Sequence, residues 1–432
     1  MPFSIAIVGA GPAGLTLARL LQVANVDVSI TIFEHDASPT SRLYQGGTLD
    51  LHTDTGLAAL KKAGLWEEAL KHLRYDGEEL SFADENATII VHKKHSSMAG
   101  AKVDYERPEI DREILKGMLL NSVKPEMVQW GKTLRSIEPT NGILTFRDGT
   151  TAGPFDLVVG ADGAWSKVRH VLTDIRPHYA GMGGFESVIE NPDRDYPKIS
   201  KMVGRGSYFS FSDGKAIVAQ RMGDESIKVS QWSLKEENYP SDLMASCGSD
   251  EEKLKEMVLE NYRDWACELR EVVRASTNLR PRSLYELPVG HFWDHRKGYT
   301  LIGDSASLMT PFTGEGVNKA MKDALELAEV LETAVTRNGS MDEAVEQYEQ
   351  VMFPRAQKIQ QRTMHNKNAM FRGGPVQFMI GMVDVITEES GIDLKKGWLS
   401  WIPIKTIMWC CLSLRQVIGG YRRKLRDLFS RR

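Results

Sequence analysis

Three glycine-rich segments, far apart in the chain, combine flexible backbone with nearby acidic side chains. They are Gly9–Gly14, Gly160–Arg169, and Gly303-Asp304 together with Pro311–Asn318. Backbone N–H groups at glycine turns that precede a helix bind phosphate, and carboxylates accept hydrogen bonds from ribose hydroxyls. The residues therefore suit the binding of a dinucleotide, provided that the fold brings the segments together.

The first segment has the spacing Gly9-x-Gly11-x-x-Gly14, between an apolar run and a helical sequence. The first glycine permits a tight turn, the second lets the backbone approach a pyrophosphate, and the third lets helix and strand pack closely. Glu34, twenty residues after Gly14, ends the next apolar run and could accept hydrogen bonds from a ribose diol. A structural glycine turn is the alternative, but this context favours dinucleotide binding. The candidate contacts are Gly9, Gly11, Ala13, Gly14 and Glu34.

The second segment contains an Asp162-Gly163 turn, followed by Ser166, Lys167 and Arg169. Asp162 is a candidate for contact with an extended cofactor. The same residues also suit a capped helix start, with Ser166 as the N-cap and Asp162 as a turn residue. The sequence leaves both interpretations open.

The third segment places Asp304 after a predicted strand and a Gly314-x-Gly316 turn before a predicted helix. Asp304 could hold ribityl or ribose hydroxyls, or could simply cap a helix. The turn presents N–H groups to negative charge, which a flavin needs because its pyrimidine ring becomes anionic on reduction. The cofactor-binding candidates here are Gly303, Asp304, Gly314, Gly316, Val317 and Asn318. Pro311, Phe312 and Gly314 are expected to line the reaction site, and no acid or base is assigned.

The elements that position these segments begin with a strand, a helix and a second strand. Phe3–Val8 and Val28–Phe33 are apolar runs typical of buried parallel strands, and Leu15–Ala24 has helical spacing. These elements form a βαβ unit of the expected length. We further expect helices at Asp54–Ala63, Glu67–Leu73, Asp111–Val123 and Asn318–Arg337, strands at Leu157–Val159 and Tyr299–Ile302, and a hairpin from Leu144 leading back into the same sheet.

The pattern changes between Tyr179 and Tyr285. Alternating segments at Ser207–Ser212, Lys215–Gln220 and Ile227–Leu234 predict a half-solvated antiparallel sheet, interrupted by a helix at Glu251–Glu271. The predicted fold class is therefore α/β, with a Rossmann-like nucleotide-binding domain, an inserted and mainly antiparallel substrate domain, and a C-terminal helical region. The expected bounds are 1–75, 101–178 and 285–337 for the first, 76–100 and 179–284 for the second, and 338–432 for the third.

Composition and charge narrow the class of protein. The chain of 432 residues suits two lobes, and its net charge of −4 gives no sign of a nucleic-acid binder. Its four cysteines show neither metal-site nor disulfide spacing, and no signal peptide precedes the first turn. These features indicate a cytoplasmic location. They leave the oligomeric state unknown.

The C-terminal region is both apolar and basic. Trp398–Tyr421 is rich in Trp, Ile, Leu and Cys, and residues 390–432 hold ten Lys and Arg against two Asp, a net charge of +8. Lys405 and Arg415 interrupt the apolar run, so a membrane-spanning helix is not expected. Two interpretations remain: a helix packed on the rest of the protein, or peripheral membrane contact through residues 398–432.

Taken together, the three segments resemble the fingerprints of the flavoprotein monooxygenases typified by 4-hydroxybenzoate hydroxylase, in the same order and at similar spacing. Gly46–His52, Lys61–Leu65 and Gly303–Asn318 are especially similar to the tetracycline-inactivating flavin monooxygenases. The resemblance covers roughly Ser4 to Phe371 and implies that the nucleotide-binding domain binds FAD.

Residue by residue, the resemblance implies that Asp50 and Arg112 contact FAD. It also places Asp304 at the ribityl and pyrophosphate groups, and Arg42 near the entry of the nicotinamide. Asp50 as a turn residue and Arg112 as an ordinary helix charge are the alternatives.

Two departures from the family concern the substrate. Gln45 is inserted before the matching Gly46-Gly47, and the position of a polar histidine of the family's pocket falls at Val229. The resemblance therefore leaves tetracycline itself in doubt as a substrate, while it retains the type of reaction.

The activity that the resemblance implies is hydroxylation of a small, aromatic or polycyclic molecule. NADPH or NADH acts as a transient co-substrate that reduces FAD, and O₂ then forms a flavin C4a-hydroperoxide that delivers one oxygen atom. A flavin oxidase or reductase is an alternative. A halogenase is another, because Trp398-Leu-Ser-Trp401-Ile402-Pro403 partly resembles a halogenase signature, although with different spacing.

Overall fold

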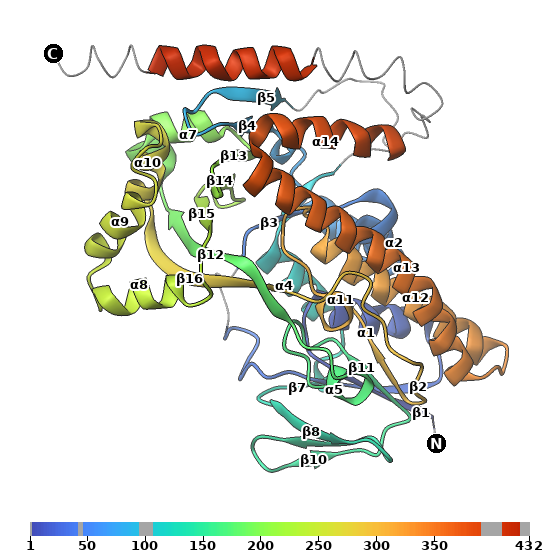
Figure 1. Ribbon diagram of the computed structural model, residues 1–432. Helices are drawn as coiled ribbons and strands as arrows, with labels where there is room; N and C mark the ends of the chain where they lie inside the picture. The colour runs from blue at the N-terminus through green and yellow to red at the C-terminus, as the bar shows by residue number, and fades with distance from the viewer. Residues whose placement is uncertain (1, 42–45, 95–106, 390–407, 424–432) are drawn as a thin grey trace. The chain divides into compact units, whose positions relative to one another are not determined.

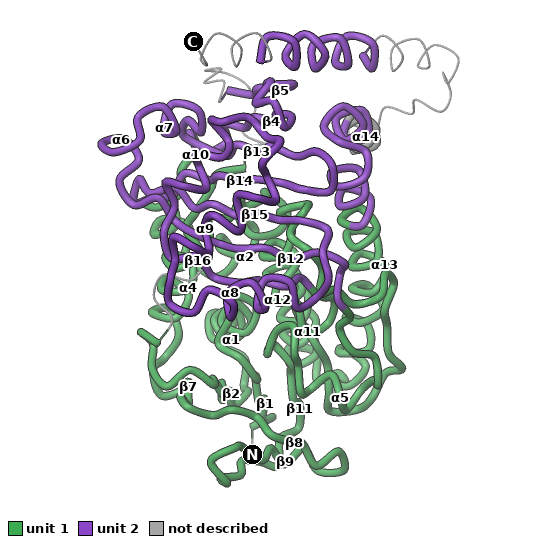
Figure 2. Tube along the Cα trace, turned by 60° about the vertical axis from the view of Figure 1, so that its left-hand side comes forward, with its two compact units in different colours: residues 1–75, 99–178, 285–363 green, residues 76–98, 179–284, 364–432 purple. Residues whose placement is uncertain are grey.

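The computed structural model describes residues 2–41, 46–94, 107–389 and 408–423. The chain forms two compact units, which Figure 2 distinguishes by colour. Unit 1 comprises Met1–Tyr75, Ala99–His178 and Tyr285–Thr363. Unit 2 comprises Asp76–Met98, Tyr179–Leu284 and Met364–Arg432. Each unit is thus assembled from three separate stretches of the chain.

Unit 1 is built on a five-stranded parallel sheet in the order β17-β11-β1-β2-β7 (Figure 1). Its strands are β1 (Phe3–Val8), β2 (Val28–Phe33), β7 (Val128–Gln129), β11 (Leu157–Gly160) and β17 (Tyr299–Leu301). The last four residues of β1 and all of β11 are buried, as expected for strands covered on both faces. The strands predicted at Phe3–Val8 and Val28–Phe33 are confirmed with the same bounds.

Helices pack around this sheet. Helix α1 (Pro12–Ala24) contacts both α12 (Gly316–Thr336) and α4 (Arg112–Ser122), and their apolar side chains share one core with the strands. The other helical segments of unit 1 are η1 (Thr53–Leu57), α2 (Ala58–Lys62), α3 (Trp66–Leu70), η4 (Pro125–Met127), α5 (Arg169–Leu172) and α11 (Asp304–Ser307). Helix α13 (Met341–Asn368) belongs to unit 1 as far as Thr363.

Two small antiparallel sheets complete unit 1. One pairs β3 (Thr48–Asp50) with β6 (Glu109–Asp111), and the other contains β8 (Leu134–Glu138), β9 (Ile143–Phe146) and β10 (Thr151–Ala152). The hairpin predicted from Leu144 is present as β9 and β10, but it does not belong to the parallel sheet. Its strand β9 pairs with β8 and β10, which form a sheet of their own, and only the following strand β11 joins the parallel sheet.

Unit 2 is built on a seven-stranded sheet in the order β16-β12-β15-β14-β13-β4-β5. Its strands are β4 (Leu80–Ala83), β5 (Ile89–Lys93), β12 (His178–Ile189), β13 (Ser207–Ser212), β14 (Lys215–Arg221), β15 (Ile227–Leu234) and β16 (Thr277–Glu286). The strand pairs β12–β15, β15–β14 and β14–β13 are antiparallel, while β13 and β4 pair in parallel. The strands predicted at Ser207–Ser212 and Ile227–Leu234 are confirmed with the same bounds.

The helices between Pro197 and Ala275 cover one face of this sheet and form a second hydrophobic core with it, whereas Phe378 packs against Phe82 and Phe211 on the other face. The helical segments are η2 (Asp76–Glu78), α6 (Pro192–Asp195), α7 (Pro197–Val203), α8 (Tyr239–Cys247), α9 (Glu251–Glu260), α10 (Cys267–Ala275), η5 (Ala369–Gly373), α14 (Gly374–Glu389) and a helix at residues 408–423. The prediction of a single helix over Glu251–Glu271 is wrong. The chain turns after Glu260, where the Ala266 N–H donates to the carbonyl of Glu85 (2.8 Å) instead of continuing the helix.

Candidate functional site

The glycines of the first segment differ in what surrounds them. Gly9 has φ +109°, and a Cβ there would lie 2.3 Å from the carbonyl oxygen of Ala161. A Cβ on Gly14 would lie 2.2 Å from the carbonyl oxygen of Gly9. A Cβ on Gly11, the N-cap of α1, would meet no protein atom within 4 Å. Gly9 and Gly14 are thus required by close backbone packing, whereas Gly11 leaves open space at the helix N-terminus, where a phosphate would lie.

Glu34 lies beside this turn, as the sequence predicted. Its buried carboxylate accepts the N–H of Ala10 at Oε2 (2.6 Å) and the N–H of Asp36 at Oε1 (3.0 Å). A carboxylate has about four acceptor positions, so the two backbone bonds and the His35 ring nitrogen, 2.7 Å from Oε1, leave capacity for about one hydroxyl donor. Glu34 therefore both holds the glycine turn in place and offers acceptor oxygens next to it.

The second segment lies beside the first because β11 pairs with β1, and the Ala161 N–H donates to the carbonyl of Val8 (2.8 Å). Two local bonds from side chains to the backbone are present: the Ser166 hydroxyl accepts the Arg169 N–H (3.0 Å), and Asp162 accepts the Lys167 N–H (2.7 Å), although the residue at the N-cap of α5 is Val168 and not Ser166. The other oxygen of Asp162 accepts from the Ser305 hydroxyl (3.1 Å), which ties the second segment to the third.

Arg169, the last residue of the second segment, makes the same connection, although it was not among the candidate contacts predicted from the sequence. Its fully buried guanidinium donates to the carbonyls of Ser305 (2.7 Å), Asp304 (3.0 Å) and Ala164 (3.0 Å). Burial lowers the pKa of Arg169 to about 10, against the opposing effect of Asp162 and Asp304, so the group stays charged at neutral pH. Nothing in its local sequence distinguishes it from a surface arginine.

The Gly303-Asp304 turn of the third segment rests on buried charged residues. Gly303 has φ +64°, its N–H donates to Asp323 (2.8 Å), and its carbonyl accepts from Lys319 (2.8 Å). Arg355 donates to the second oxygen of Asp323 (2.9 Å), and both Lys319 and Asp323 are fully buried. Asp304 itself remains exposed next to this turn. Sequence reasoning missed the cluster, because two charges on the long amphipathic helix α12 look like ordinary surface residues.

The Gly314-x-Gly316 turn precedes α12 and lies beside Asp50. Gly314 has φ +71°, and a Cβ there would lie 3.1 Å from an Asp50 carboxylate oxygen. The other carboxylate oxygen of Asp50 is 2.9 Å from Nε2 of His52. The structure therefore brings Asp50, which the resemblance singled out, next to the third segment.

The side chain of Asn318 forms hydrogen bonds with other residues of the protein. Its side-chain oxygen accepts from the His52 N–H (2.9 Å) and the Thr55 hydroxyl (3.0 Å), and its amide nitrogen donates to the Asp50 carbonyl (2.7 Å). The predicted site residue Asn318 is thus a clamp that fixes the turn carrying Asp50.

Replacing Asn318 with alanine is expected to lower the free energy of unfolding by about 2 kcal/mol, because it leaves buried backbone groups of this turn without partners. FAD affinity should fall as well, since Asp50 loses its fixed position. Denaturant unfolding of the apoprotein and a flavin titration measure the two effects. The control Asn121→Ala, on the exposed face of α4, should change neither. Wild-type FAD affinity in the Asn318 variant would contradict the clamp.

The remaining candidate site residues predicted from the sequence lie in different environments. Arg112 begins α4 with an exposed side chain near Gly46, Ala13 is buried close to Gly303, and Val317 is part of the hydrophobic core. Pro311 is exposed and Phe312 half-buried in the loop before α12. Arg42 lies outside the described residues.

Glu109 pairs with Asp50 across the β3–β6 ladder and was not anticipated from the sequence. Burial raises its pKa to about 8, with the carboxylates of Asp50 and Asp111 acting in the same direction and Arg74 opposing them. A raised pKa means that folding takes up a proton between pH 4.5 and about 8. The contribution of Glu109 to stability is therefore greatest below this window and is lost as the pH rises through it.

Glu109→Gln is consequently expected to gain stability relative to wild type as the pH rises, by on the order of 1–3 kcal/mol between mildly acidic and alkaline pH. Denaturant unfolding of both proteins across this pH range measures the difference, and the exposed Glu126→Gln variant is the control. A difference between wild type and the Glu109→Gln variant that does not change with pH would show that Glu109 is ionised throughout.

In unit 2 the position matched to a pocket histidine lies in the core. Val229 is fully buried in the hydrophobic cluster between the sheet and its helices. Side chains alternate along a strand, so Lys228 and Ser230 face the other side, where Lys228 is 3.0 Å from Glu186. Phe82, which packs against Phe209, Phe211 and Phe378, lies on that same side of the sheet.

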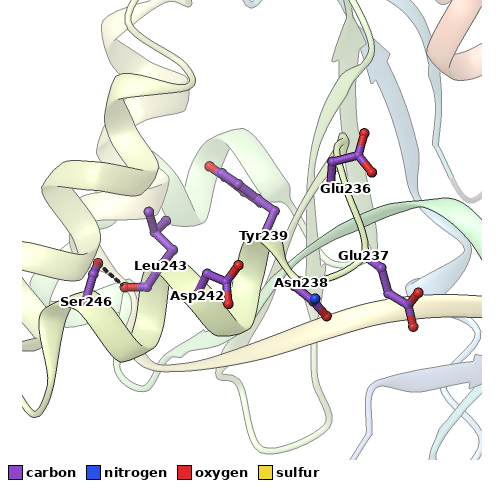
Figure 3. A pocket seen from close by; sticks show the side chains of 7 residues that line it. All are labelled: Glu236, Glu237, Asn238, Tyr239, Asp242, Leu243 and Ser246. Atoms are coloured by element: carbon purple, nitrogen blue, oxygen red, sulfur yellow. Dashed lines mark hydrogen bonds between the residues drawn. The ribbon is translucent and has the colours of Figure 1, made fainter.

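A surface hollow of about 700 Å³ also lies in unit 2, at the start of α8 (Figure 3). It is lined by Glu236, Glu237, Asn238, Tyr239, Asp242, Leu243 and Ser246, and the Ser246 hydroxyl donates to the Leu243 carbonyl (2.7 Å). Its three carboxylates would repel a phosphate, and it contains none of the residues of the three glycine-rich segments. This hollow is therefore not the nucleotide site.

The residues present fit FAD. Within unit 1, β1, β11 and β17 are neighbours, so the three segments that follow them meet at the carboxyl ends of these strands, where ligands bind in parallel α/β sheets. The open space at Gly11 admits a pyrophosphate, Glu34 and Asp304 offer acceptor oxygens, and the α12 N-terminus offers N–H donors.

The sequence matches the family described as FAD binding domain over residues 3–363. The monooxygenase asqM of Emericella nidulans is 31% identical over 426 residues, which cover 84% of this chain and 94% of that protein. HpxO of Klebsiella pneumoniae complexed with FAD and uric acid has a TM-score of 0.70 at 17% identity, covering 95% of this chain and 96% of that one. Tetracycline destructase Tet(51) has a TM-score of 0.63 at 17% identity, covering 95% and 98%. The predicted fold class is thereby confirmed.

Proposed function

Because this chain belongs to the FAD binding domain family and is an FAD-dependent monooxygenase, we propose that it hydroxylates a small aromatic or polycyclic molecule with electrons from NADPH or NADH and one atom of O₂. The observation that carries the proposal is the meeting of the three glycine-rich segments at one edge of the parallel sheet. Relatives that share this family are monooxygenases by name, which supports oxygen insertion over the oxidase, reductase and halogenase alternatives.

In this proposal each segment binds a different part of FAD. Gly9, Gly11, Ala13 and Gly14 bind the pyrophosphate through backbone N–H groups at the start of α1, and Glu34 accepts hydrogen bonds from the ribose. Asp162, Gly303 and Asp304 contact the ribityl and pyrophosphate region. Asp50, held by Asn318, contacts FAD from the β3–β6 ladder, with Arg112 nearby and Arg42 at the side where the nicotinamide enters.

FAD, when bound, supplies the electron transfer and the activation of O₂. The protein has to exclude water, orient the substrate and stabilise negative charge. The backbone N–H groups of Gly316 and Val317, at the positive end of α12, stabilise the charge that develops on the pyrimidine ring, while the Gly314 N–H donates to the Pro311 carbonyl (3.1 Å) and closes the preceding turn. Pro311, Phe312 and Gly314 line the reaction site, and no protein side chain is assigned as an acid or a base.

The proposed substrate is flat and conjugated. HpxO was solved with uric acid, and Tet(51) is named for tetracycline, so a ring system suits proteins of this fold. We assign substrate binding to unit 2, whose sheet carries Phe82 and Phe209 on the side away from the helix-covered core. Aromatic side chains favour stacked or edge-on contact with such rings.

The test is the visible spectrum of the purified protein, followed by anaerobic reduction with NADPH or NADH in the presence of aromatic and polycyclic compounds. A yellow protein whose bleaching is accelerated by one compound, and which incorporates ¹⁸O from ¹⁸O₂ into that compound, establishes the hydroxylase. Peroxide without oxygenated product would identify an oxidase, and a product that requires halide would identify a halogenase.

We also propose a cytoplasmic location with peripheral membrane contact through residues 398–432. Of this region the structure describes residues 408–423, which form a helix in unit 2. Among the described residues, none of the helices has the length and hydropathy needed to cross a membrane. The contact would accordingly be with the membrane surface.

A further inference from the structure

The helix at residues 408–423, which Figure 1 draws in red, presents large apolar side chains to solvent, as their exposed fractions show. Trp409 is 52% exposed, Leu414 60%, Val417 55%, Ile418 43% and Tyr421 66%. These five are a third of the large hydrophobic residues that are exposed among the described part of the chain. A surface helix ordinarily turns such residues toward the core and its polar residues toward water. We call these five residues the apolar stripe.

Polar contacts on the other side of the helix fix this orientation. Arg415 donates to the carbonyl of Ile90 in β5 (3.2 Å), and Arg423 donates to the Asn86 side chain (2.8 Å) and the Asp264 carbonyl (2.9 Å). These partners all belong to unit 2. Rotating the helix to bury the stripe would break these hydrogen bonds.

Glycine on the same side allows the close approach. A Cβ on Gly419 would lie 1.9 Å from the Thr88 hydroxyl oxygen, so a larger residue there would push the helix away. Met408, Leu412 and Gln416, one helical turn apart, are half-buried on this inner side. The inner side is therefore small and partly polar, and most of the large apolar surface points outward.

Charge indicates what covers the stripe. Residues 390–432 carry ten Lys and Arg against two Asp, while the whole chain has a net charge of −4. Positive charge is thus concentrated in the part of the sequence that contains the stripe, with Arg415 and Arg422 exposed on the helix itself. Cations beside an outward apolar helix face match a bilayer whose headgroups are anionic and whose interior accepts apolar side chains.

We propose that the apolar stripe docks on the surface of a membrane that contains anionic lipid. This inference rests on the membrane contact proposed above. It adds which surface of the protein makes the contact and which lipid charge the protein prefers. The helix lies in the plane of the interface, with the stripe inserted among the acyl chains and the exposed Arg422 at the headgroups, while Arg415 and Arg423 hold the helix on unit 2. An enzyme held there meets substrates that partition into the bilayer.

The test is co-sedimentation of the FAD-loaded, full-length protein with vesicles of phosphatidylcholine alone or mixed with phosphatidylserine. We expect binding to the mixed vesicles that weakens with salt. The variant Leu414→Gln/Val417→Gln/Ile418→Gln should bind them about tenfold less tightly or worse, because three apolar side chains no longer insert. The matched control Val23→Gln/Leu70→Gln/Val351→Gln changes three exposed hydrophobic residues elsewhere and should bind as wild type.

Each outcome separates the proposals. Undiminished binding by the stripe variant would overturn the stripe as the docking surface while leaving membrane contact in place, and equal binding to both vesicles would overturn the selection for anionic lipid. No vesicle binding by any protein would overturn this inference and the membrane contact together, without touching the hydroxylase. If the wild-type protein formed dimers and bound no vesicles, and the stripe variant stayed monomeric, the stripe would instead be an interface with a second copy of the chain. Flavin content and unfolding midpoint verify that the variants are folded.

Discussion

Gly14→Ala is expected to abolish FAD binding and to destabilise the apoprotein by about 3 kcal/mol or more, the upper range for overpacking a core. The new Cβ would lie 2.2 Å from the carbonyl oxygen of Gly9 and 3.0 Å from the side chain of Ile7. The nearest atom belongs to the backbone of the glycine turn, so no side-chain rotation relieves the contact. Helix α1 must move away from β1, which displaces the N–H groups that face the phosphates.

Gly11→Ala is the matched control, since the same methyl group is added three residues earlier in the same turn. No protein atom lies within 4 Å of its Cβ. The apoprotein should therefore unfold at the wild-type denaturant concentration, while FAD affinity falls because the methyl group occupies space next to the pyrophosphate. Denaturant unfolding of the apoproteins and titration with FAD separate the two effects.

The two variants should thus differ: Gly14→Ala loses both stability and FAD binding, whereas Gly11→Ala loses FAD affinity alone. A turn with a purely structural role would not give this difference. If the Gly11→Ala variant bound FAD as tightly as wild type, the open space at Gly11 would not be the pyrophosphate site. If the Gly14→Ala variant were as stable as wild type, the close packing of α1 on the turn would be wrong.

Asp323→Ala is expected to cost about 3 kcal/mol of stability, because it leaves the fully buried Lys319 without its ion-pair partner, while the partly buried Arg355 keeps its second partner Glu326. It also removes the acceptor of the Gly303 N–H. The turn before Asp304 should then lose its position, so FAD affinity should fall beyond what partial unfolding explains. The exposed Asp27→Ala variant, in the loop between α1 and β2, is the control and should be neutral.

A second substitution distinguishes positioning from simple stability. Lys319→Met/Asp323→Leu removes the fully buried lysine and its partner together, so it should be less destabilising than Asp323→Ala alone. In the double variant Gly303 loses both of its side-chain partners, the Asp323 acceptor and the Lys319 donor. The FAD affinity of this variant should therefore remain low, and the visible spectrum of bound flavin should shift. Recovery of wild-type FAD affinity in this double variant would show that the cluster stabilises the fold without positioning the turn.

Local pattern was sufficient for much of unit 1. The bounds of β1 and β2 and the place of Glu34 could be predicted, because the two apolar runs and the Gly9-x-Gly11-x-x-Gly14 spacing belong to one βαβ unit that is continuous in sequence. Strands β13 and β15 were equally clear, because alternation along a strand follows from burial of one face. The family followed from the order of the three glycine segments.

Which face of the sheet a side chain occupies could be decided only from the structure of the sheet. Val229 was matched to a pocket position, but a shift of one residue along β15 moves a side chain to the opposite face, and the structure places Val229 in the core. The break between α9 and α10 was also invisible, since it depends on a hydrogen bond from Ala266 to Glu85, which is distant in sequence.

The sequence by itself thus determined the fold class, because strands, helices and glycine turns depend on residues close together in the chain, and the resemblance of the three glycine-rich segments to a flavoprotein family indicated FAD. Tertiary structure alone decided how those segments are held. Arg169 reaches the carbonyls of Ser305 and Asp304, Asp323 supports Gly303, and the stripe on residues 408–423 faces outward. Each of these arrangements joins residues far apart in the chain, and a charged or apolar side chain has the same local pattern whether it is buried or exposed.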